Sequence, residues 1–190
     1  MAEILGDGRS AGDWFALRVR SNSEKVTTAH LEARGLQPFL PLYRSRRTWS
    51  NRIKDLDFPL FPGYVFCRFV VTNRLPVLSA PGVVGIVGAG KVPIPLDPRE
   101  IEAIRRVAGS GLPAEPWPYL KAGQIVRVDH GALKNVEGIL LDVKSKQRLL
   151  VSVTLLQRSV TVEIERDWIS PVWRAGAGRE DTLPKQRTAS

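Results

Sequence analysis

The fold is decided by residues 59–71, which read PLFPGYVFCRFVV. Tyr64–Val71 is nearly all apolar, with aromatic and β-branched side chains, which predicts a central strand buried on both faces. A Pro-Gly pair comes directly before this strand and predicts a rigid turn. Phe61, Tyr64 and Phe66 lie around the turn, where an anchoring surface for another protein and a core-filling hairpin explain them equally well.

Strands and helices alternate on both sides of that stretch. Asp97 followed by Pro98 predicts a helix start, because an N-cap acid precedes a proline at the first helical position. Ser21 followed three residues later by Glu24 predicts a capping box for another helix. Helices between antiparallel strands predict an α+β fold, with an α/β sandwich over residues 13–109. The expected strands are Trp14–Val19, Leu36–Tyr43, Tyr64–Val71 and Val83–Val87, the expected helices are Glu24–Arg34, Asn73–Ala80 and 97–108, and Arg44–Asp55 is expected to be a hairpin loop.

The pattern changes to short strands alone in residues 119–173. Turn residues separate these strands at regular intervals, which predicts a small all-β barrel because a closed sheet leaves few exposed edges. Gly123, Gly131 and Gly138 lie where sharp reversals are expected. The expected strands are Gln124–Val128, Glu137–Val143, Arg148–Val153, Ser159–Ile164 and Trp168–Val172.

Residues 110–118 are predicted to connect the two domains. The stretch around them reads GSGLPAEPWP, and its prolines and glycines favour a semi-extended connector without regular structure. Such a connector predicts few contacts between the two domains. Residues 1–12 and 174–190 lack apolar periodicity and are expected to be disordered tails.

The composition is that of a soluble globular protein, with 43% hydrophobic and 25% charged residues in a chain of 190. No apolar run approaches the ~20 residues that cross a bilayer. The N-terminus lacks the apolar core of a signal peptide, so a cytoplasmic location is expected. Cys67 is the single cysteine, which excludes an intramolecular disulfide. Its place in the most apolar strand predicts an inert core thiol.

The charge is uneven along the chain, whose formal net charge is +9. Residues 13–110 carry fifteen Lys and Arg against eight acids, and residues 119–173 carry eight against six. A basic first half indicates a polyanion or an acidic protein as partner, although a solvated basic surface is an equal explanation. A basic loop with an aromatic residue inside it favours nucleic-acid contact by phosphate pairing and base stacking over a merely solvated hairpin. Its residues are Arg44, Arg46, Arg47, Trp49, Arg52 and Lys54.

No catalytic constellation is evident in the sequence. Residues 85–91 fit a nucleotide-binding P-loop, but Val92 replaces the Ser or Thr that binds magnesium, and prolines follow where a helix should begin. A strand-turn-strand is the better interpretation. His30 and His130 lie in different predicted domains, with no acid or cysteine cluster around either. We therefore expect no enzyme activity, no metal and no cofactor.

In this order, the motifs resemble the NusG family of transcription elongation factors. The first predicted domain is similar to the family's N-terminal domain and the second to its SH3-like KOW domain. The matching pieces cover about residues 13–173. They are Trp14–Leu17, the helix after Ser21, Phe61–Phe66, Pro81–Val83, Pro93–Pro95 and the glycines of the second domain.

The resemblance implies a monomeric protein without a membrane that binds RNA polymerase and acts in elongation, antipausing and antitermination. It implies that Phe61, Pro62, Tyr64 and Phe66 bind the clamp helices of the largest polymerase subunit. Asn73, Arg74 and Leu75 fall where relatives touch the second-largest subunit. The basic loop would lie near the non-template DNA or nascent RNA. The KOW domain implies the ribosomal protein NusE or the termination factor Rho as further partners.

Two segments resemble the specialised UpxY- and LoaP-like antiterminators, namely Leu155–Val160 and Arg18–Ser21. General NusG proteins more often read Phe-Gly-Arg-x-Thr-Pro at the first of these places, and that Phe is associated with NusE and Rho. The departure favours a specialised paralogue for long operons. A general NusG elongation and termination factor and a KOW-type ribosome-associated RNA-binding protein are the alternatives.

Overall fold

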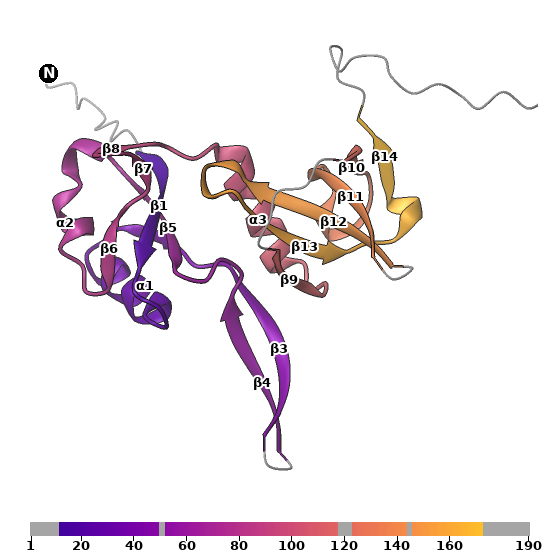
Figure 1. Ribbon diagram of the computed structural model, residues 1–190, viewed down its shortest axis with the longest axis horizontal. Coiled ribbons are helices and arrows are strands. Elements are labelled where there is room, and N and C mark those ends of the chain that lie inside the picture. The colour runs from indigo at the N-terminus through magenta and orange to yellow at the C-terminus, as the bar shows by residue number, and fades with distance from the viewer. Residues whose placement is uncertain (1–11, 50–51, 118–122, 144–145, 173–190) are drawn as a thin grey trace, which may run out of the picture.

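The computed structural model describes residues 12–49, 52–117, 123–143 and 146–172 (Figure 1). Of the predicted tails at residues 1–12 and 174–190, all but Gly12 lies outside the described residues. Two parts follow one another along the chain, an N-terminal unit (residues 12–109) and a C-terminal sheet (residues 114–172). This arrangement confirms the predicted α+β fold with an all-β second part.

The N-terminal unit is built on a four-stranded antiparallel sheet in the order β2-β5-β1-β6. β5 lies between two neighbours, and its residues Val65, Phe66 and Cys67 are fully buried. The most apolar stretch of the sequence is therefore a central strand, as predicted. The elements of this unit are β1 (Asp13–Val19), α1 (Glu24–Ala33), β2 (Gln37–Phe39), β5 (Tyr64–Phe69), the 3₁₀ turn η1 (Val71–Asn73), α2 (Leu75–Leu78), β6 (Val83–Ile86) and α3 (Pro98–Gly109).

The start of α1 differs from the predicted capping box. Ser23, not Ser21, is the N-cap residue. The Glu24 carboxylate is buried and accepts a hydrogen bond of 2.8 Å from the backbone N–H of Gly63. The prediction was wrong because this carboxylate is used by the turn that leads into β5 rather than by its own helix. Gly63 has a φ of +83°, a backbone conformation that favours glycine.

A long hairpin projects from the N-terminal unit, formed by β3 (Leu42–Trp49) and β4 (Arg52–Pro59) (Figure 1). The expected polar loop at Arg44–Asp55 is thus mostly paired strand. Polar composition suggested a loop, but a ladder is held by backbone hydrogen bonds and needs no apolar side chains along its length. At its base Tyr43 packs on Phe58, with ring centroids 6.0 Å apart. The P-loop-like run forms the small hairpin β7 (Gly88–Ala89) and β8 (Val92–Pro93), which confirms the strand-turn-strand interpretation.

The C-terminal sheet has six strands in the order β14-β10-β11-β12-β13-β9, all antiparallel. The predicted connector is wrong in part, because Ala114–Trp117 forms β9 and pairs with the edge of β13. The remaining elements are β10 (Ile125–Val128), η2 (Gly131–Leu133), β11 (Glu137–Val143), β12 (Lys146–Val153), η3 (Thr154–Leu156), β13 (Arg158–Glu163), η4 (Arg166–Trp168) and β14 (Ile169–Pro171).

Helix α3 lies between the two parts and packs against β1 on one side and against β12 and η2 on the other (Figure 1). Its buried residues Ile101, Ile104 and Val107 belong to one continuous apolar cluster. That cluster includes Trp14 and Phe66 of the N-terminal unit together with many residues of the C-terminal sheet. The expectation of few contacts between the two parts is therefore wrong, because their cores are joined through α3.

Among the described helices, none combines the length and apolar character that a membrane crossing requires. Within the same residues, no three His, Cys, Asp or Glu side chains gather closely enough to hold a metal ion.

The turn before β6 generates a stability prediction. Gly82 has a φ of +87°, and a Cβ there would lie 2.2 Å from Oγ1 of Thr27, which donates a hydrogen bond of 3.0 Å to the carbonyl of Pro81. We expect Gly82→Ala to lower the free energy of unfolding by about 2 kcal/mol or more, since strained backbone and a displaced hydroxyl add together. Gly85→Ala is the matched control, because open space surrounds that position. Equal denaturant midpoints for the two variants would contradict the prediction.

Candidate functional site

The residues predicted to bind the polymerase clamp form an aromatic patch, defined as Phe61, Pro62, Tyr64 and Phe66. Phe61 and Phe66 are buried and pack edge to face, with ring centroids 5.4 Å apart. Tyr64 is half-buried and Pro62 is exposed. Two members of the aromatic patch are therefore core residues in this arrangement, while Tyr64 and Pro62 lie at its border.

The C-terminal sheet reaches over that border through Arg158. Its guanidinium lies 5.2 Å from the centroid of the Tyr64 ring, within the range of a cation–π interaction. The same guanidinium donates a hydrogen bond of 3.5 Å to the carbonyl of Pro62. Arg158 thus contacts both border residues of the aromatic patch at once. A protein that binds Tyr64 from outside must first displace this arginine.

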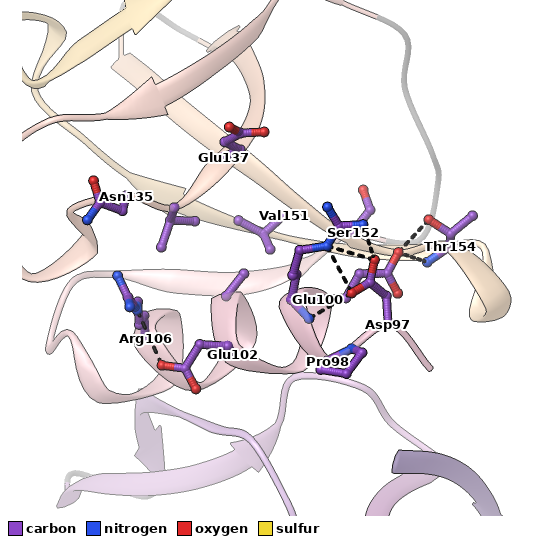
Figure 2. Close-up of a pocket in the computed structure, with 13 residues that line it drawn as sticks. Asp97, Pro98, Glu100, Glu102, Arg106, Asn135, Glu137, Val151, Ser152 and Thr154 are labelled. Atoms are coloured by element: carbon purple, nitrogen blue, oxygen red, sulfur yellow. Dashed lines mark hydrogen bonds and ion pairs between the residues drawn. The ribbon is translucent and has the colours of Figure 1, made fainter. Parts of the chain in front are cut away.

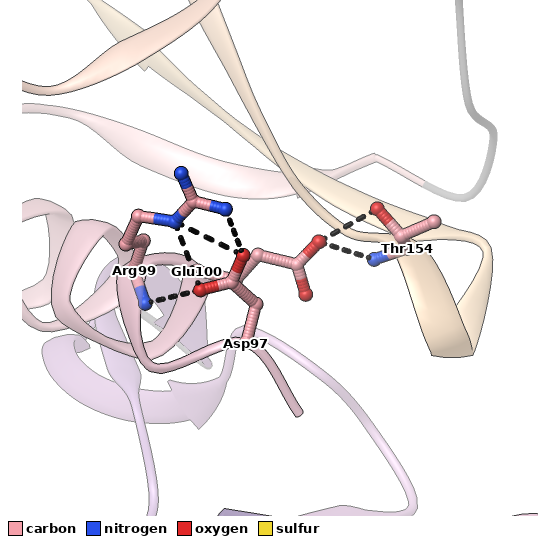
Figure 3. A network of polar contacts seen from close by, with 4 residues as sticks. All are labelled: Asp97, Arg99, Glu100 and Thr154. Carbon is pink, nitrogen blue, oxygen red and sulfur yellow. Dashed lines mark hydrogen bonds and ion pairs between the residues drawn. The ribbon is translucent and has the colours of Figure 1, made fainter. Parts of the chain in front are cut away.

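Two further contacts join the parts along α3. One carboxylate oxygen of Glu100 accepts hydrogen bonds from the hydroxyl and the backbone N–H of Thr154, at 2.6 and 3.1 Å (Figure 3). At the other end of the helix, Arg106 donates to the carbonyl of Lys134. An open cleft of about 910 Å³ lies between these two contacts, and Figure 2 shows α3 along one side and the C-terminal sheet along the other. Charged and polar side chains line much of this cleft. We call it the seam; it is a polar boundary between the two parts, beside their apolar contact.

The start of α3 is fixed by Asp97, the predicted N-cap. Its carboxylate accepts a hydrogen bond of 2.8 Å from the backbone N–H of Arg99 and pairs with the guanidinium of the same residue (Figure 3). The Arg99 side chain lowers the pKa of Asp97 from its ordinary value, with its backbone N–H as the second cause. This cap fixes the first turn of the helix, in which Glu100, three residues after Asp97, contacts Thr154.

The predicted second contact, Asn73, Arg74 and Leu75, lies elsewhere on the N-terminal unit. These residues end η1 and begin α2 and are exposed, with Leu75 at 75%. Figure 1 places α2 on the side of the unit away from the C-terminal sheet. Arg34 at the end of α1 holds α2 in place by hydrogen bonds to the hydroxyl of Ser79 at 2.8 Å and to its carbonyl at 3.1 Å. The segment is thus free of the contacts that cover the aromatic patch.

The predicted nucleic-acid residues belong to the β3–β4 hairpin. Arg44 lies at its base and pairs with Asp57 at 3.7 Å. The side chains of the other five lie outside the described part of the structure, but the backbone register of the hairpin is described. The register places Arg46 opposite Asp55. The pairs that alternate with this one along the ladder contain no carboxylate. These pairs include Arg47 opposite Lys54 and Trp49 opposite Arg52.

Sequence reasoning missed the residues that hold the two parts together. Arg158 and Glu100 are 96 and 54 positions from their partners, so no local pattern marks them. Arg105 also makes contacts that no local pattern marks, although within the N-terminal unit: its guanidinium lies 4.9 Å from the ring centroid of Trp14 and 5.1 Å from that of Phe39. A basic residue on a helix is ordinarily a solvated one, and only the packing shows otherwise.

Cys67 contributes no chemistry to this surface. Burial raises the pKa of its thiol to about 12, so almost no thiolate exists near neutral pH. The prediction of an inert core thiol is confirmed.

The N-cap of α3 generates a prediction about pH. We expect Asp97→Ala to lower the free energy of unfolding by about 1 kcal/mol at pH 7, because a backbone N–H loses its acceptor. The folded protein lowers the pKa of Asp97, so its contribution is complete above the unfolded value near ~4 and is lost as the pH falls. Urea unfolding of both proteins should therefore give a difference that shrinks between about pH 5 and pH 3. A difference that grows in acid would contradict the assignment.

Comparison with known proteins agrees with this architecture. Residues 12–105 match the family model described as "Transcription termination factor nusG". A relative from Pseudomonas aeruginosa, "Transcription termination/antitermination protein NusG", is 30% identical over 81% of this chain and 90% of its own length. A relative of the same name from Halalkalibacterium halodurans is 29% identical over 80% of this chain and 94% of its own length.

A solved structure, "Domain interaction in Thermotoga maritima NusG", shares the fold with a TM-score of 0.52. It is 24% identical and covers 85% of this chain and 97% of its own length. The relatives are named for transcription rather than for catalysis, in agreement with the non-enzymatic role expected from the sequence. Fold, motifs and relatives together place this chain in the NusG family of transcription termination and antitermination factors.

Proposed function

We propose that this chain is a specialised NusG paralogue that binds RNA polymerase and promotes readthrough of long operons. The aromatic patch would bind the clamp helices of the largest subunit once Arg158 has moved away. The exposed segment Asn73–Leu75, on another side of the N-terminal unit, would touch the second-largest subunit. Bridging the two jaws disfavours their opening, so paused states become less populated. No cofactor is required for such a tether.

The cover over the aromatic patch is the single observation that carries the specialised reading. If only a fraction of molecules is open, the apparent dissociation constant rises by the inverse of that fraction. A factor that is mostly closed binds polymerase poorly unless a signal at particular genes favours the open form. Contacts at Arg158, Glu100 and Arg106 support the closed arrangement. The lowered affinity of the closed form would restrict binding to genes that carry the signal. This restriction suits a specialised factor and does not help a factor that acts on all genes.

The general NusG factor is the second candidate, favoured by the names of the relatives. A polymerase occupancy profile separates the two, since a general factor would be nearly uniform over transcribed genes. NusE or Rho binding through the C-terminal sheet would also favour the general role. Recovery of ribosomal RNA without polymerase in a pull-down would instead support the ribosome-associated alternative.

Nucleic-acid contact is proposed for the β3–β4 hairpin, which projects from the N-terminal unit (Figure 1). Within it, Arg44 is compensated by Asp57, and Arg46 stands opposite Asp55. The register pairs that contain no carboxylate, Arg47 opposite Lys54 and Trp49 opposite Arg52, combine cations with an aromatic residue. That combination suits a single strand, whose phosphates pair with the cations and whose bases stack. The displaced non-template DNA is the expected ligand, with nascent RNA as the alternative.

Polymerase binding is tested by two substitutions with opposite expected signs. Tyr64→Ala removes an anchor and should weaken binding by at least ~2 kcal/mol, as at a buried hot spot. Arg158→Ala removes the cover and should tighten binding severalfold, because the open fraction rises. Arg127→Ala, at another exposed arginine of the C-terminal sheet, is the control and should change little. Titration with purified polymerase measures all three affinities.

A folded Tyr64→Ala protein with normal affinity would remove the aromatic patch from the interface. Weaker binding of Arg158→Ala would show that the arginine contacts the polymerase instead of covering its site.

The hairpin is tested through the salt dependence of binding to single-stranded DNA. Each phosphate contact contributes about −0.7 to the log–log slope of affinity against salt. The double substitution Arg47→Gln and Lys54→Gln should therefore reduce the steepness of the slope by about 1.4. Arg44→Gln is the control, since its charge is already paired with Asp57, and it should reduce the slope less than either single change. Unchanged slopes together with unchanged pausing would remove the hairpin from the mechanism.

A further inference from the structure

The chain passes from α3 to the C-terminal sheet by a very short route. α3 ends at Gly109, and β9 begins at Ala114 on the edge of β13. The carbonyl of Pro113 already accepts a hydrogen bond of 3.1 Å from the backbone N–H of Glu163. Only residues 110–113 therefore lie between the helix and the sheet, and Gly111 among them has a φ of +70°.

β9 is a short strand at the edge of the sheet. Pro116 has no N–H to donate, and it occupies a position of the ladder that needs none, opposite Val160. One side-chain contact that holds β9 is an ion pair between Glu115 and Arg148 of β12, and Ala114 also packs against the apolar cluster. Arg148 also reaches Glu163 at 3.4 Å, so it joins β9, β12 and β13 at one point. Its side chain is only 19% exposed, which limits screening by water.

Pairing of β9 sets how far the two parts can separate. While β9 stays on β13, the tether from Gly109 to Ala114 extends to at most about 18 Å. If β9 leaves, the tether runs from Gly109 to Ile125 and extends to about 58 Å. The shorter tether keeps the edge of β13 beside the C-terminal end of α3. The shorter tether therefore holds a detached sheet close to α3, at a high effective concentration that favours rebinding.

We propose that β9 is a releasable clasp, whose departure from β13 lengthens the tether and so favours separation of the C-terminal sheet from the aromatic patch. Arg148 acts as the positioning residue of the clasp, through its ion pair with Glu115. The proposed polymerase role gives this device its consequence, but the device itself concerns only this chain. It is therefore tested without polymerase, and its failure would leave the proposed function standing.

Two backbone amides report the two events separately. The N–H of Glu163 donates to Pro113, so its exchange with solvent follows release of β9. The N–H of Thr154 donates to Glu100 across the seam, so its exchange follows separation of the two parts. Both rates are measured by NMR on the full chain, since exchange reports local opening.

Glu115→Gln weakens the clasp without touching the seam. We expect both amides to exchange about two- to fivefold faster, the range for a partly exposed ion pair. Glu115→Lys places a like charge beside Arg148 and should accelerate both amides further. Asp129→Asn is the matched control, because it removes the Arg127–Asp129 ion pair of the same sheet, away from β9. That control should leave both rates unchanged.

A disulfide between β9 and β13 provides the converse test. Pro113 and Glu163 form a hydrogen-bonded pair, so Ala114 and Val162 form the next, non-hydrogen-bonded pair. Their Cα atoms are expected about 4.5 Å apart, a separation that a disulfide accepts. In oxidised Ala114→Cys/Val162→Cys, the Thr154 amide should exchange about threefold or more slowly than after reduction. The buried Cys67 thiol does not compete, since its pKa is about 12.

Equal exchange of Thr154 in the oxidised and reduced forms would overturn the proposal, because the parts would then separate as readily with the clasp closed. So would Glu115 variants in which Glu163 exchanges faster while Thr154 does not change. If the cysteine pair fails to fold, the graded series Glu115→Gln and Glu115→Lys decides the question alone.

Discussion

The structure depends on the burial of α3 from two sides. Its apolar residues Ile101, Ile104 and Val107 belong to a cluster that includes both the N-terminal unit and the C-terminal sheet. A helix with one apolar stripe is ordinarily satisfied by one partner. Here the residues beside the stripe, Glu100 and Arg106, bind the second partner through polar contacts. Separation of the two parts therefore exposes apolar surface and breaks hydrogen bonds in the same event.

The closed arrangement and the proposed polymerase binding would use the same aromatic patch. Phe61 and Phe66 fill the core beneath the turn, while Tyr64 and Pro62 at the border are covered by Arg158. A partner that binds Tyr64 and Pro62 must supply more binding free energy than Arg158 and the contacts along α3 give to the closed form. Separation also exposes the apolar surface around α3, so that surface and the polar contacts hold the closed form together.

Two elements of the N-terminal unit lie away from the covered aromatic patch. The hairpin β3–β4 projects away from both parts, and α2 lies on another side of the N-terminal unit (Figure 1). Among the described residues, α2 makes none of the contacts named above between the two parts, whereas the base of the hairpin at Tyr43 packs against the shared apolar cluster. If the hairpin binds nucleic acid as proposed, that binding would not require the aromatic patch to be free.

The sequence by itself determined the local elements, because their signals are local. The apolar run before residue 71 is the central strand β5, and the Asp97-Pro98 start and the stop at Gly109 bound α3. The Gly90 turn of the false P-loop was also predicted, since prolines exclude the helix that a phosphate site needs. The family resemblance, which depends on the order of such motifs, came from the same local information.

Tertiary structure alone decided which of these elements meet. A proline-rich stretch reads as a connector, yet β9 forms because the edge of β13 offers it backbone partners and its proline occupies a position that needs no donor. Polar residues of the hairpin read as a loop, yet the ladder pairs their backbone. Arg158 over Tyr64 and Glu100 against Thr154 join residues far apart in sequence, and such contacts depend on how complete surfaces pack together. The cover over the aromatic patch is a property of that packing, which no local pattern encodes.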